Sequence, residues 1–334
     1  MTSIDWSSLG FKYSKTPYNV RCVCKDGVWG EIEIHTEDTI NMSIAASCLH
    51  YGQESFEGLK AFKGVDGKVR LFRVDENAKR MNSSAEYVKM HTFDIELFIE
   101  MVKKAVELNI DFVPPYETGA SLYIRPLLIG TAPQLGVHPG AETTLIIFVC
   151  PVGAYFAGMM KAVIGRKYDR AAEHGTGHVK VGGNYAASLT PAMEAEKLGY
   201  DNVFYLDPVN KRYIEECGAA NFFGIKNNTY ITPKSTSVLP SITNKSLCVI
   251  AEDMGLKVER RNIDVEELST FDEAGACGTA AVITPIGQID DLENNVTYNF
   301  GDTAGEWSTK LCKHLKDIQY GIEEDTHQWI TIVE

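Results

Sequence analysis

Several features that would assign this chain to a functional class at once are missing. No Gly-x-Gly-x-x-Gly string follows an expected strand, and no Gly-x-x-x-x-Gly-Lys-Ser/Thr string occurs, which argues against dinucleotide and P-loop sites. The eight cysteines include no Cys-x-x-Cys pair, and the histidines lack the spacing of a zinc site. We therefore expect no metal, and we interpret the cysteines as reduced, buried thiols.

Signals for export and for membrane insertion are also missing. The first residues contain neither the basic nor the apolar segment of a secretory signal, and no apolar run is long enough to span a bilayer, so we expect a cytoplasmic protein. Lysine and arginine number 32 against 45 aspartates and glutamates, a formal net charge of −13. This balance argues against nucleic acid or an anionic membrane as a general partner.

The length of 334 residues predicts two domains. In the first half, strands and helices alternate, which is typical of an α+β domain. Asp75 is expected to cap a helix that runs towards Met90. A glycine-rich stretch without periodicity then predicts a linker over 156–166. The remaining elements of the first half are strands over 69–72, 121–125 and 144–149 and a helix over 95–108.

The second half predicts hairpins, helices and further strands. Turn residues between apolar runs indicate hairpins at 203–206/212–215 and 221–226/229–232. Helices are predicted over 186–198, where Gly199 ends the helix, over 244–254 and over 304–320, with a short one over 265–269. Strands are predicted over 257–263, 277–285 and 286–289.

The string Lys180-Val181-Gly182-Gly183-Asn184-Tyr185 most directly suggests chemistry. A lysine forms a covalent bond with a carbonyl group when its pKa is lowered by burial or by nearby cations. The adjacent glycines let a flat ligand approach the backbone, and the Tyr185 phenol can bond a ligand oxygen. Taken alone, the string fits an exposed lysine at a strand-to-turn junction better.

A lysine that serves pyridoxal phosphate needs groups for the phosphate, for the ring nitrogen and for the substrate carboxylate. The N–H groups of Ile242 and Thr243, at the start of an expected helix, suit a phosphate. Glu215 and Glu216 end a strand, and alternation lets at most one of them face a cofactor. Further candidates are the small residues 278–281 and the cations Arg80 and Arg125. Individually, these features also fit a capped helix, solvated carboxylates, a packed strand and a surface arginine.

These segments together, in this order, resemble the branched-chain amino acid aminotransferases, fold-type IV pyridoxal-phosphate enzymes. Two strings are specific for the class: Phe56-Glu57-Gly58-Leu59-Lys60-Ala61-Phe62 and Lys180-x-Gly-Gly-Asn-Tyr185. Tyr123-Ile124-Arg125-Pro126 and the tail 318–322 are similar to the longer subgroup shared by eukaryotes and some bacteria. Further matching segments are 51–55, 120–122, 151–156, 216–223, 239–243 and 278–280.

The resemblance implies an α+β fold of two domains. A small α+β N-terminal domain over 1–155 would be joined by the linker 156–166 to a larger C-terminal, cofactor-binding domain over 167–334 with a β-barrel-like core. It also implies a homodimer, pyridoxal 5′-phosphate as cofactor, and branched-chain amino acids, glutamate and 2-oxo acids as the small-molecule partners.

The resemblance also implies roles for individual residues. Lys180 would be the catalytic residue, holding the cofactor and moving a proton between the substrate α-carbon and cofactor C4′. Tyr185 would bond the cofactor's phenolic oxygen, and Glu216 would pair with its ring nitrogen. Arg125 would bind the second carboxylate of glutamate or 2-oxoglutarate. The phosphate would be held by Arg80, Ile242, Thr243 and Thr279, and the substrate by Tyr51, Phe56, Tyr123, Arg125, Tyr155, Thr279 and Ala280.

The expected activity is reversible amino transfer between L-Leu, L-Ile or L-Val and 2-oxoglutarate by a ping-pong mechanism. The chain departs from the common pattern at Ser241, where glycine is usual, at Asn244, where arginine is usual, and at Ala219, where some relatives have threonine. The alternatives are a D-amino acid aminotransferase or aminodeoxychorismate lyase on the same fold, or a catalytically silent binding protein.

Overall fold

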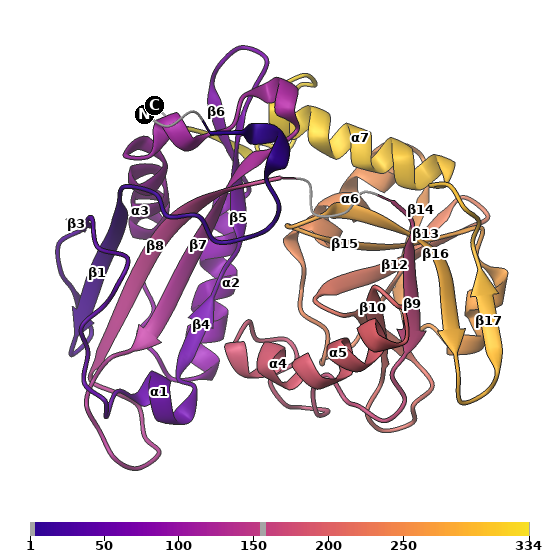
Figure 1. Cartoon of the computed structure of the whole chain (residues 1–334), viewed down its shortest axis with the longest axis horizontal. Helices are drawn as coiled ribbons and strands as arrows, with labels where there is room; N and C mark the ends of the chain where they lie inside the picture. The colour runs from indigo at the N-terminus through magenta and orange to yellow at the C-terminus, as the bar shows by residue number, and fades with distance from the viewer. Residues whose placement is uncertain (1–3, 154–157, 334) are drawn as a thin grey trace. The chain divides into compact units, whose positions relative to one another are not determined.

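The computed structural model describes residues 4–153 and 158–333 (Figure 1). The chain forms two compact units. The first comprises Met1–Tyr155, Val179–Gly182 and Asp317–Glu334, and the second comprises Phe156–His178 and Gly183–Lys316. The domain ranges 1–155, 156–166 and 167–334 stay a prediction. The structure adds that residues 179–182, which include Lys180, and residues 317–334 belong to the first unit.

The first unit is built on an antiparallel sheet in the order β18-β6-β5-β7-β8-β1-β2, with β3 paired to β1 and β4 to β7. Its longest strands are β7 and β8, which pair from Ser121↔Val152 to Gly130↔Thr143. The strands are β1 (Asn19–Lys25), β2 (Val28–Trp29), β3 (Glu33–His35), β4 (Glu54–Phe56), β5 (Leu59–Lys63), β6 (Val69–Phe72), β7 (Ser121–Gly130), β8 (Glu142–Val152) and β18 (Ile330–Val333).

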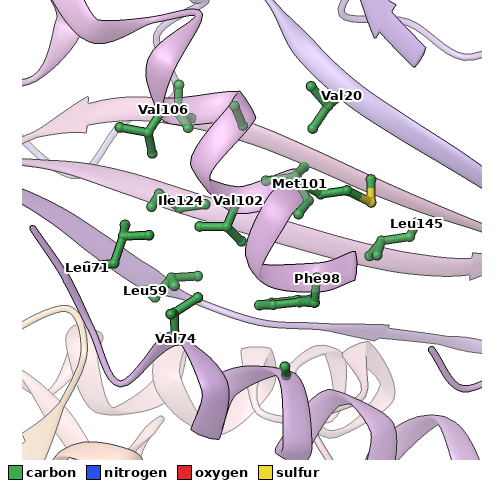
Figure 2. Packing of buried hydrophobic residues seen from close by; sticks show 14 of the residues in the cluster. Val20, Leu59, Leu71, Val74, Phe98, Met101, Val102, Val106, Ile124 and Leu145 are labelled. Carbon is green, nitrogen blue, oxygen red and sulfur yellow. The ribbon is translucent and has the colours of Figure 1, made fainter. Parts of the chain in front are cut away.

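The helices of the first unit pack on this sheet and enclose its core. Helix α3 (Ile95–Glu107) buries residues at helical spacing, including Phe98, Met101 and Val102, as its sequence predicts. Figure 2 shows these side chains beside Leu59 and Ile124 of the sheet. The other elements are α1 (Ser47–Tyr51), α2 (Val74–Tyr87) and the 3₁₀ turns Trp6–Ser8, Ile110–Phe112 and Tyr116–Thr118.

The start of α2 differs from the prediction. Asp75 lies in the first turn rather than at the cap, and the N-cap residue is Arg73, in the left-handed region with φ 51° and no side-chain cap. The Arg73 N–H donates to the Trp329 carbonyl oxygen at 2.7 Å. A residue far along the chain therefore fixes the entry to α2, and the local sequence does not reveal it.

The second unit contains a closed ring of strands. The order is β11-β10-β9-β16-β15-β12-β13-β14, and an additional β11–β12 pairing closes the first six strands into a barrel. This confirms the predicted α+β fold with a barrel-like core. The strands are β9 (Met160–Ile164), β10 (Asn202–Leu206), β11 (Ile214–Cys217), β12 (Ala220–Lys226), β13 (Thr229–Pro233), β14 (Lys257–Arg261), β15 (Glu273–Gly278), β16 (Val282–Asp291) and β17 (Val296–Asn299).

Part of the segment predicted as a linker is a strand of this ring. Residues 160–164 form β9, which pairs in parallel with both β10 and β16. Its residues Ala162 and Ile164 are buried in the barrel core with Phe204 and Phe222. The flanking glycines at 158 and 165 border a short buried strand instead of marking a continuous linker.

The helix predicted over 186–198 is two helices. Helix α4 (Gly182–Ala187) ends before α5 (Leu189–Lys197) begins, and Pro191 is the third residue of α5. A proline has no N–H to donate to the carbonyl four residues earlier and disfavours one continuous helix through this point. The other helical elements are α6 (Ile242–Asp253), α7 (Glu306–Tyr320) and the 3₁₀ turn Val265–Thr270.

Candidate active site

The backbone of Lys180 is held by two elements of the first unit. Its N–H donates to Ser84 Oγ on α2 at 3.1 Å, and its carbonyl accepts from the Phe56 N–H and from Ser55 Oγ, both at 3.1 Å. Lys180 Nζ lies 4.6 Å from the centre of the Phe56 ring. The half-buried lysine is therefore fixed at its backbone, with its ammonium over an aromatic face.

Gly182, two residues after this lysine, lies close to a carboxylate. The Gly182 N–H donates to Glu54 Oε1, and a Cβ at Gly182 would lie 2.6 Å from the same oxygen. Burial raises the pKa of Glu54, and this effect outweighs the lowering by the Gly182 N–H and Arg125.

Arg80 is fixed by a carboxylate that the sequence analysis did not single out. Glu57 is fully buried, and it accepts from Arg80 Nε and Nη2 at 2.7 Å each. Asn77 Nδ2 and the Gly58 N–H donate to the same carboxylate at 2.7 Å and 3.2 Å. Burial alone raises the pKa of Glu57, but Arg80, Lys180 and Asn77 together hold it below its ordinary value.

A second cation of the first unit lies among aromatic rings. The Arg125 guanidinium is 4.8 Å from the Phe56 ring centre and 5.3 Å from that of Tyr123, whose hydroxyl accepts from Arg125 Nη2 at 3.1 Å. Within residues 4–153 and 158–333, no acceptor reaches the buried Arg125 Nε. A Cβ at Gly58 would lie 2.1 Å from the Tyr123 hydroxyl, so this glycine lets the ring approach.

The structure brings Lys180, Phe56, Tyr123 and Arg125 together, and it links Arg80 to Lys180 through Glu57. Tyr51 is 43% exposed, and its hydroxyl accepts from the Gly136 N–H at 2.9 Å. Its role in binding the substrate stays a prediction. Tyr155 lies outside the described residues.

In the second unit, Glu216 is the centre of a buried polar group. Its Oε1 accepts from the Leu239 N–H at 2.7 Å and from Asn221 Nδ2 at 3.0 Å. Arg170 Nε lies 2.9 Å from Glu216 Oε2. The two groups form an ion pair, although the Nε–H of Arg170 is not aligned for a hydrogen bond. A negative charge on Glu216 is therefore stabilised from both oxygens.

Glu215 and Glu216 are not solvated, because each is only 3% exposed. Their partners differ, as strand alternation predicts: Glu215 Oε1 accepts from Ser235 Oγ at 2.7 Å. Burial raises the pKa of Glu215, and the Ser235 hydroxyl and Arg170 oppose this shift without cancelling it.

The start of α6 has the form of an anion site. Ser241 is the N-cap, and its Oγ accepts from the Asn244 N–H at 3.2 Å. The N–H groups of Ile242 and Thr243 precede the first residue that a helix can bond internally. Both residues are buried. Ser241, a departure from the usual glycine, therefore stabilises the helix start and leaves two N–H groups for a ligand.

The small residues 279–281 form a turn between β15 and β16. Thr279 and Ala280 are half-buried, and Val282, which follows, has a φ of 61°. A β-branched residue in the left-handed region is an outlier, so the surrounding sheet imposes this backbone. Tyr185 is half-buried in α4.

Sequence reasoning missed three residues: Glu57, Arg170 and Asn221. Glu57 lies inside the Phe-Glu-Gly-Leu-Lys string, and Asn77 and Arg80 are three residues apart on one helical face, which was a usable signal for a shared partner. Arg170 and Asn221 carried no comparable signal. Among the described side chains, no group of three or more His, Cys, Asp or Glu residues could hold a metal ion.

The amino-transferase class IV family model matches residues 54–289, more than half of the chain. The chain belongs to this family. It is 46% identical to a branched-chain-amino-acid aminotransferase of Helicobacter pylori over 99% of this chain and 98% of that relative. It is 45% identical to the enzyme of that name from Haemophilus influenzae, and the match covers 100% of both chains.

Solved structures of the same kind of enzyme are similar to this class IV chain. The branched-chain amino acid aminotransferase of Escherichia coli superimposes with a TM-score of 0.82 at 27% identity, over 96% of this chain and 100% of that one. A second such enzyme, from T.th. and complexed with N-(5′-phosphopyridoxyl)-L-glutamate, gives a TM-score of 0.76 at 27% identity, over 94% and 98%.

Proposed function

We propose that this chain is a branched-chain amino acid aminotransferase that uses pyridoxal 5′-phosphate to move amino groups between L-Leu, L-Ile or L-Val and 2-oxoglutarate. The observation that carries the proposal is the full-length similarity to enzymes of that name, at 46% and 45% identity. A structure similar over 94% of this chain holds a phosphopyridoxyl-glutamate ligand, which supports both the cofactor and glutamate as the amino-group partner.

The residues present fit this cofactor. A helix start with two available N–H groups suits its phosphate, and a buried, ion-paired Glu216 suits its ring nitrogen. In the proposed site, Arg80, Thr279 and the N–H groups of Ile242 and Thr243 bind the phosphate. Tyr185 bonds the phenolic oxygen.

When bound, pyridoxal phosphate supplies an electron sink for a carbanion at the substrate α-carbon. Lys180 would take the proton from the substrate α-carbon on Nζ and pass it to cofactor C4′, as amino transfer requires. Glu216 keeps a proton at the ring nitrogen, because its carboxylate is stabilised as the anion by Leu239, Asn221 and Arg170.

The proposed substrate-binding residues explain how one enzyme accepts substrates with two unlike side chains, apolar ones and the carboxylate of glutamate. Phe56 and Tyr123 offer apolar faces for Leu, Ile or Val, with Tyr51 and Tyr155 as further wall residues. Arg125, held over both rings at 4.8 and 5.3 Å, binds the side-chain carboxylate of glutamate. An apolar wall discriminates by only about 1–3 kcal/mol per methylene, so both kinds of substrate enter. The backbone of Thr279 and Ala280 receives the α-carboxylate.

Borohydride reduction of the cofactor-loaded protein, followed by peptide mapping, tests the central residue. We expect the cofactor label on Lys180, no label in Lys180→Ala, and full labelling in Lys161→Ala. Lys161 is a matched control, because its Nζ also lies over an aromatic ring, 4.9 Å from the centre of Tyr200. A label on any other lysine would overturn the proposal.

Substrate profiling separates the neighbouring functions. Transfer from L-Leu to 2-oxoglutarate is expected, whereas activity confined to D-Ala or aminodeoxychorismate would favour a D-amino acid aminotransferase or an aminodeoxychorismate lyase. A protein that gains no visible absorbance with pyridoxal phosphate would be a silent binding protein.

The proposal includes a cytoplasmic homodimer. All eight cysteines are free thiols, six of them buried, which suits a reducing compartment. In the described parts of the chain, no helix combines the length and apolarity needed to cross a membrane. Light scattering after size-exclusion chromatography measures the mass, and a value of one chain would contradict the dimer.

A further inference from the structure

A continuous chain of buried side chains in the second unit ends at Glu216. Its members are polar, each is at most 9% exposed, and they lie on β11, β12, β13 and α6. Such a network stabilises a fold only when every donor and acceptor is matched, so its bonding pattern can be worked out group by group. The members are Tyr230, Thr232, Asn244, Asn221 and Glu216.

The first step fixes the orientation of the Asn244 amide. The Phe222 carbonyl can only accept, so the Thr232 hydroxyl, 2.7 Å away, donates to it. Thr232 Oγ1 must then accept from Asn244 Nδ2 at 2.9 Å, while Asn244 Oδ1 accepts from the Tyr230 hydroxyl at 2.8 Å. The second N–H of Asn244 donates to Asn221 Oδ1 at 3.2 Å.

The second step fixes the Asn221 amide in the same way. Its Nδ2 faces the Leu239 carbonyl oxygen at 3.0 Å, which only accepts, and also reaches Glu216 Oε1 at 3.0 Å. The bonds from Tyr230 through Asn244 and Asn221 therefore all run towards the carboxylate, with side branches to Thr232 and to the Leu239 carbonyl. The chain of bonds is polarised in a single direction, which favours the ionised form of Glu216.

The network also reaches the start of α6. Asn244 is the third residue of this helix, and its N–H donates to the Ser241 cap at 3.2 Å. Its side chain thus connects the carboxylate to the helix turn whose first N–H groups are the proposed phosphate site. Asn244 is also the position where this chain departs from the arginine usual in the family it resembles.

We propose that Asn221 and Asn244 are positioning residues, which keep Glu216 ionised and hold it in register with the phosphate-binding turn of α6. The inference rests on the proposed function, because it takes Glu216 as the partner of the cofactor ring nitrogen. Its consequence is that the ring and phosphate contacts of the second unit are set by one rigid network.

The test titrates the cofactor-free protein with pyridoxal phosphate and follows the visible absorption band. In Asn244→Ala and in the isosteric Asn221→Asp, we expect the dissociation constant for pyridoxal phosphate to rise by about tenfold. This corresponds to a loss of about 1.4 kcal/mol of binding free energy. Tyr230→Phe removes only the terminal donor, so it should change affinity in the same direction by less. Asn109→Ala is the matched control, because Asn109 is 1% exposed and makes three hydrogen bonds to Tyr18 and Ala105.

The pH dependence of the same band separates positioning from a general loss of stability. If Glu216 is less ionised in a variant, the cofactor ring nitrogen is less protonated. Less positive charge then lies near the lysine nitrogen that carries the cofactor. We therefore expect the pH midpoint of the band to move upward in the Asn221 and Asn244 variants and to stay in place in Asn109→Ala.

Variants that unfold more easily yet keep the wild-type affinity and midpoint would overturn the inference and leave the proposed function intact. If Asn221→Asp does not fold, Asn244→Ala decides by the same two readouts. A wild-type protein that takes up no pyridoxal phosphate would overturn both the proposed function and this inference.

Discussion

At the scale of single residues, each unit buries a carboxylate that is matched by a cation and by hydrogen-bond donors. Glu57 receives four hydrogen bonds from Arg80, Asn77 and Gly58, and Glu216 receives two besides its ion pair with Arg170. Removing one member of a buried pair leaves the other charge uncompensated, which costs more than the pair itself contributes.

Glu57→Gln is therefore expected to lower the free energy of unfolding by about 3–5 kcal/mol at pH 7. The amide turns N–H groups towards the Arg80 guanidinium, which then has no anion. Denaturant unfolding measures the change. Asp75→Asn is the control, because the Asp75–Lys79 pair is 45% and 55% exposed and should contribute about 0–1 kcal/mol. Equal effects of both substitutions would contradict this assignment.

The sequence allowed the candidate groups to be identified at this scale, but not their partners. Strand alternation predicted that Glu215 and Glu216 point in opposite directions, and their separate partners agree with this. That both are buried could not be predicted, because their burial depends on β11 lying inside a closed ring. The contact of Glu57 with Arg80 likewise depends on how α2 packs beside β4 and β5.

At the scale of elements, the beginning of α6 depends on one hydroxyl. Ser241→Ala removes the acceptor for the Asn244 N–H and should lower the free energy of unfolding by about 1 kcal/mol. Ser241→Gly, the residue usual in related enzymes, should cost only a few tenths of a kcal/mol, since glycine also serves as an N-cap. Denaturant unfolding of both variants measures the difference. A lower free energy of unfolding for Ser241→Gly than for Ser241→Ala would contradict this prediction.

Strand β15 offers a test of side-chain packing on the sheet of the second unit. A Cβ at Gly275 would lie 2.4 Å from the Phe223 ring, which stacks on Tyr230 with centroids 4.9 Å apart. Gly275→Ala should therefore cost about 1–3 kcal/mol of unfolding free energy. At Gly278, in the same strand, the nearest atom to a Cβ is 4.0 Å away, so Gly278→Ala should be close to neutral. Thermal unfolding measures the melting temperatures of the two variants. Equal melting temperatures for Gly275→Ala and Gly278→Ala would contradict this prediction.

Most of the helices and strands predicted from periodicity are present, and the exceptions have identifiable physical causes. The single helix predicted over 186–198 divides because of Pro191, and the predicted Asp75 cap gives way to Arg73, whose N–H bonds to Trp329. The strand β9 is not predicted, because its five residues between glycines are too few to show a pattern. Its pairing with β10 and β16 is a long-range property.

At the scale of the whole molecule, buried carboxylates govern the response to acid. Burial alone raises the pKa of Asp291, but Arg166 and Asn294 outweigh it and hold the pKa below the ordinary value of 3.8. A carboxyl with a lower pKa when folded adds stability above its unfolded pKa. That stability is lost as the pH falls through the folded value.

Asp291→Asn should therefore be less stable than the wild type at pH 7, by about 1–3 kcal/mol, with the difference shrinking as the pH falls below 3.8. Denaturant unfolding across a pH series measures this. Asp302→Asn, at an exposed carboxyl, is the control and should follow the wild-type curve. A deficit in Asp291→Asn that stays constant with pH would contradict the assignment.

The pairing of β18 with β6 has a consequence for how the protein is made. Ile330 pairs with Phe72 and Val333 with Val69, so one edge of the first sheet consists of residues that follow the whole second unit in the chain. A ribosome delivers the chain from its N-terminus and covers the residues it has just joined. The second unit, which ends at Lys316, can emerge whole while the first still lacks a strand. The first unit, most of which precedes the second in the chain, is therefore completed after it.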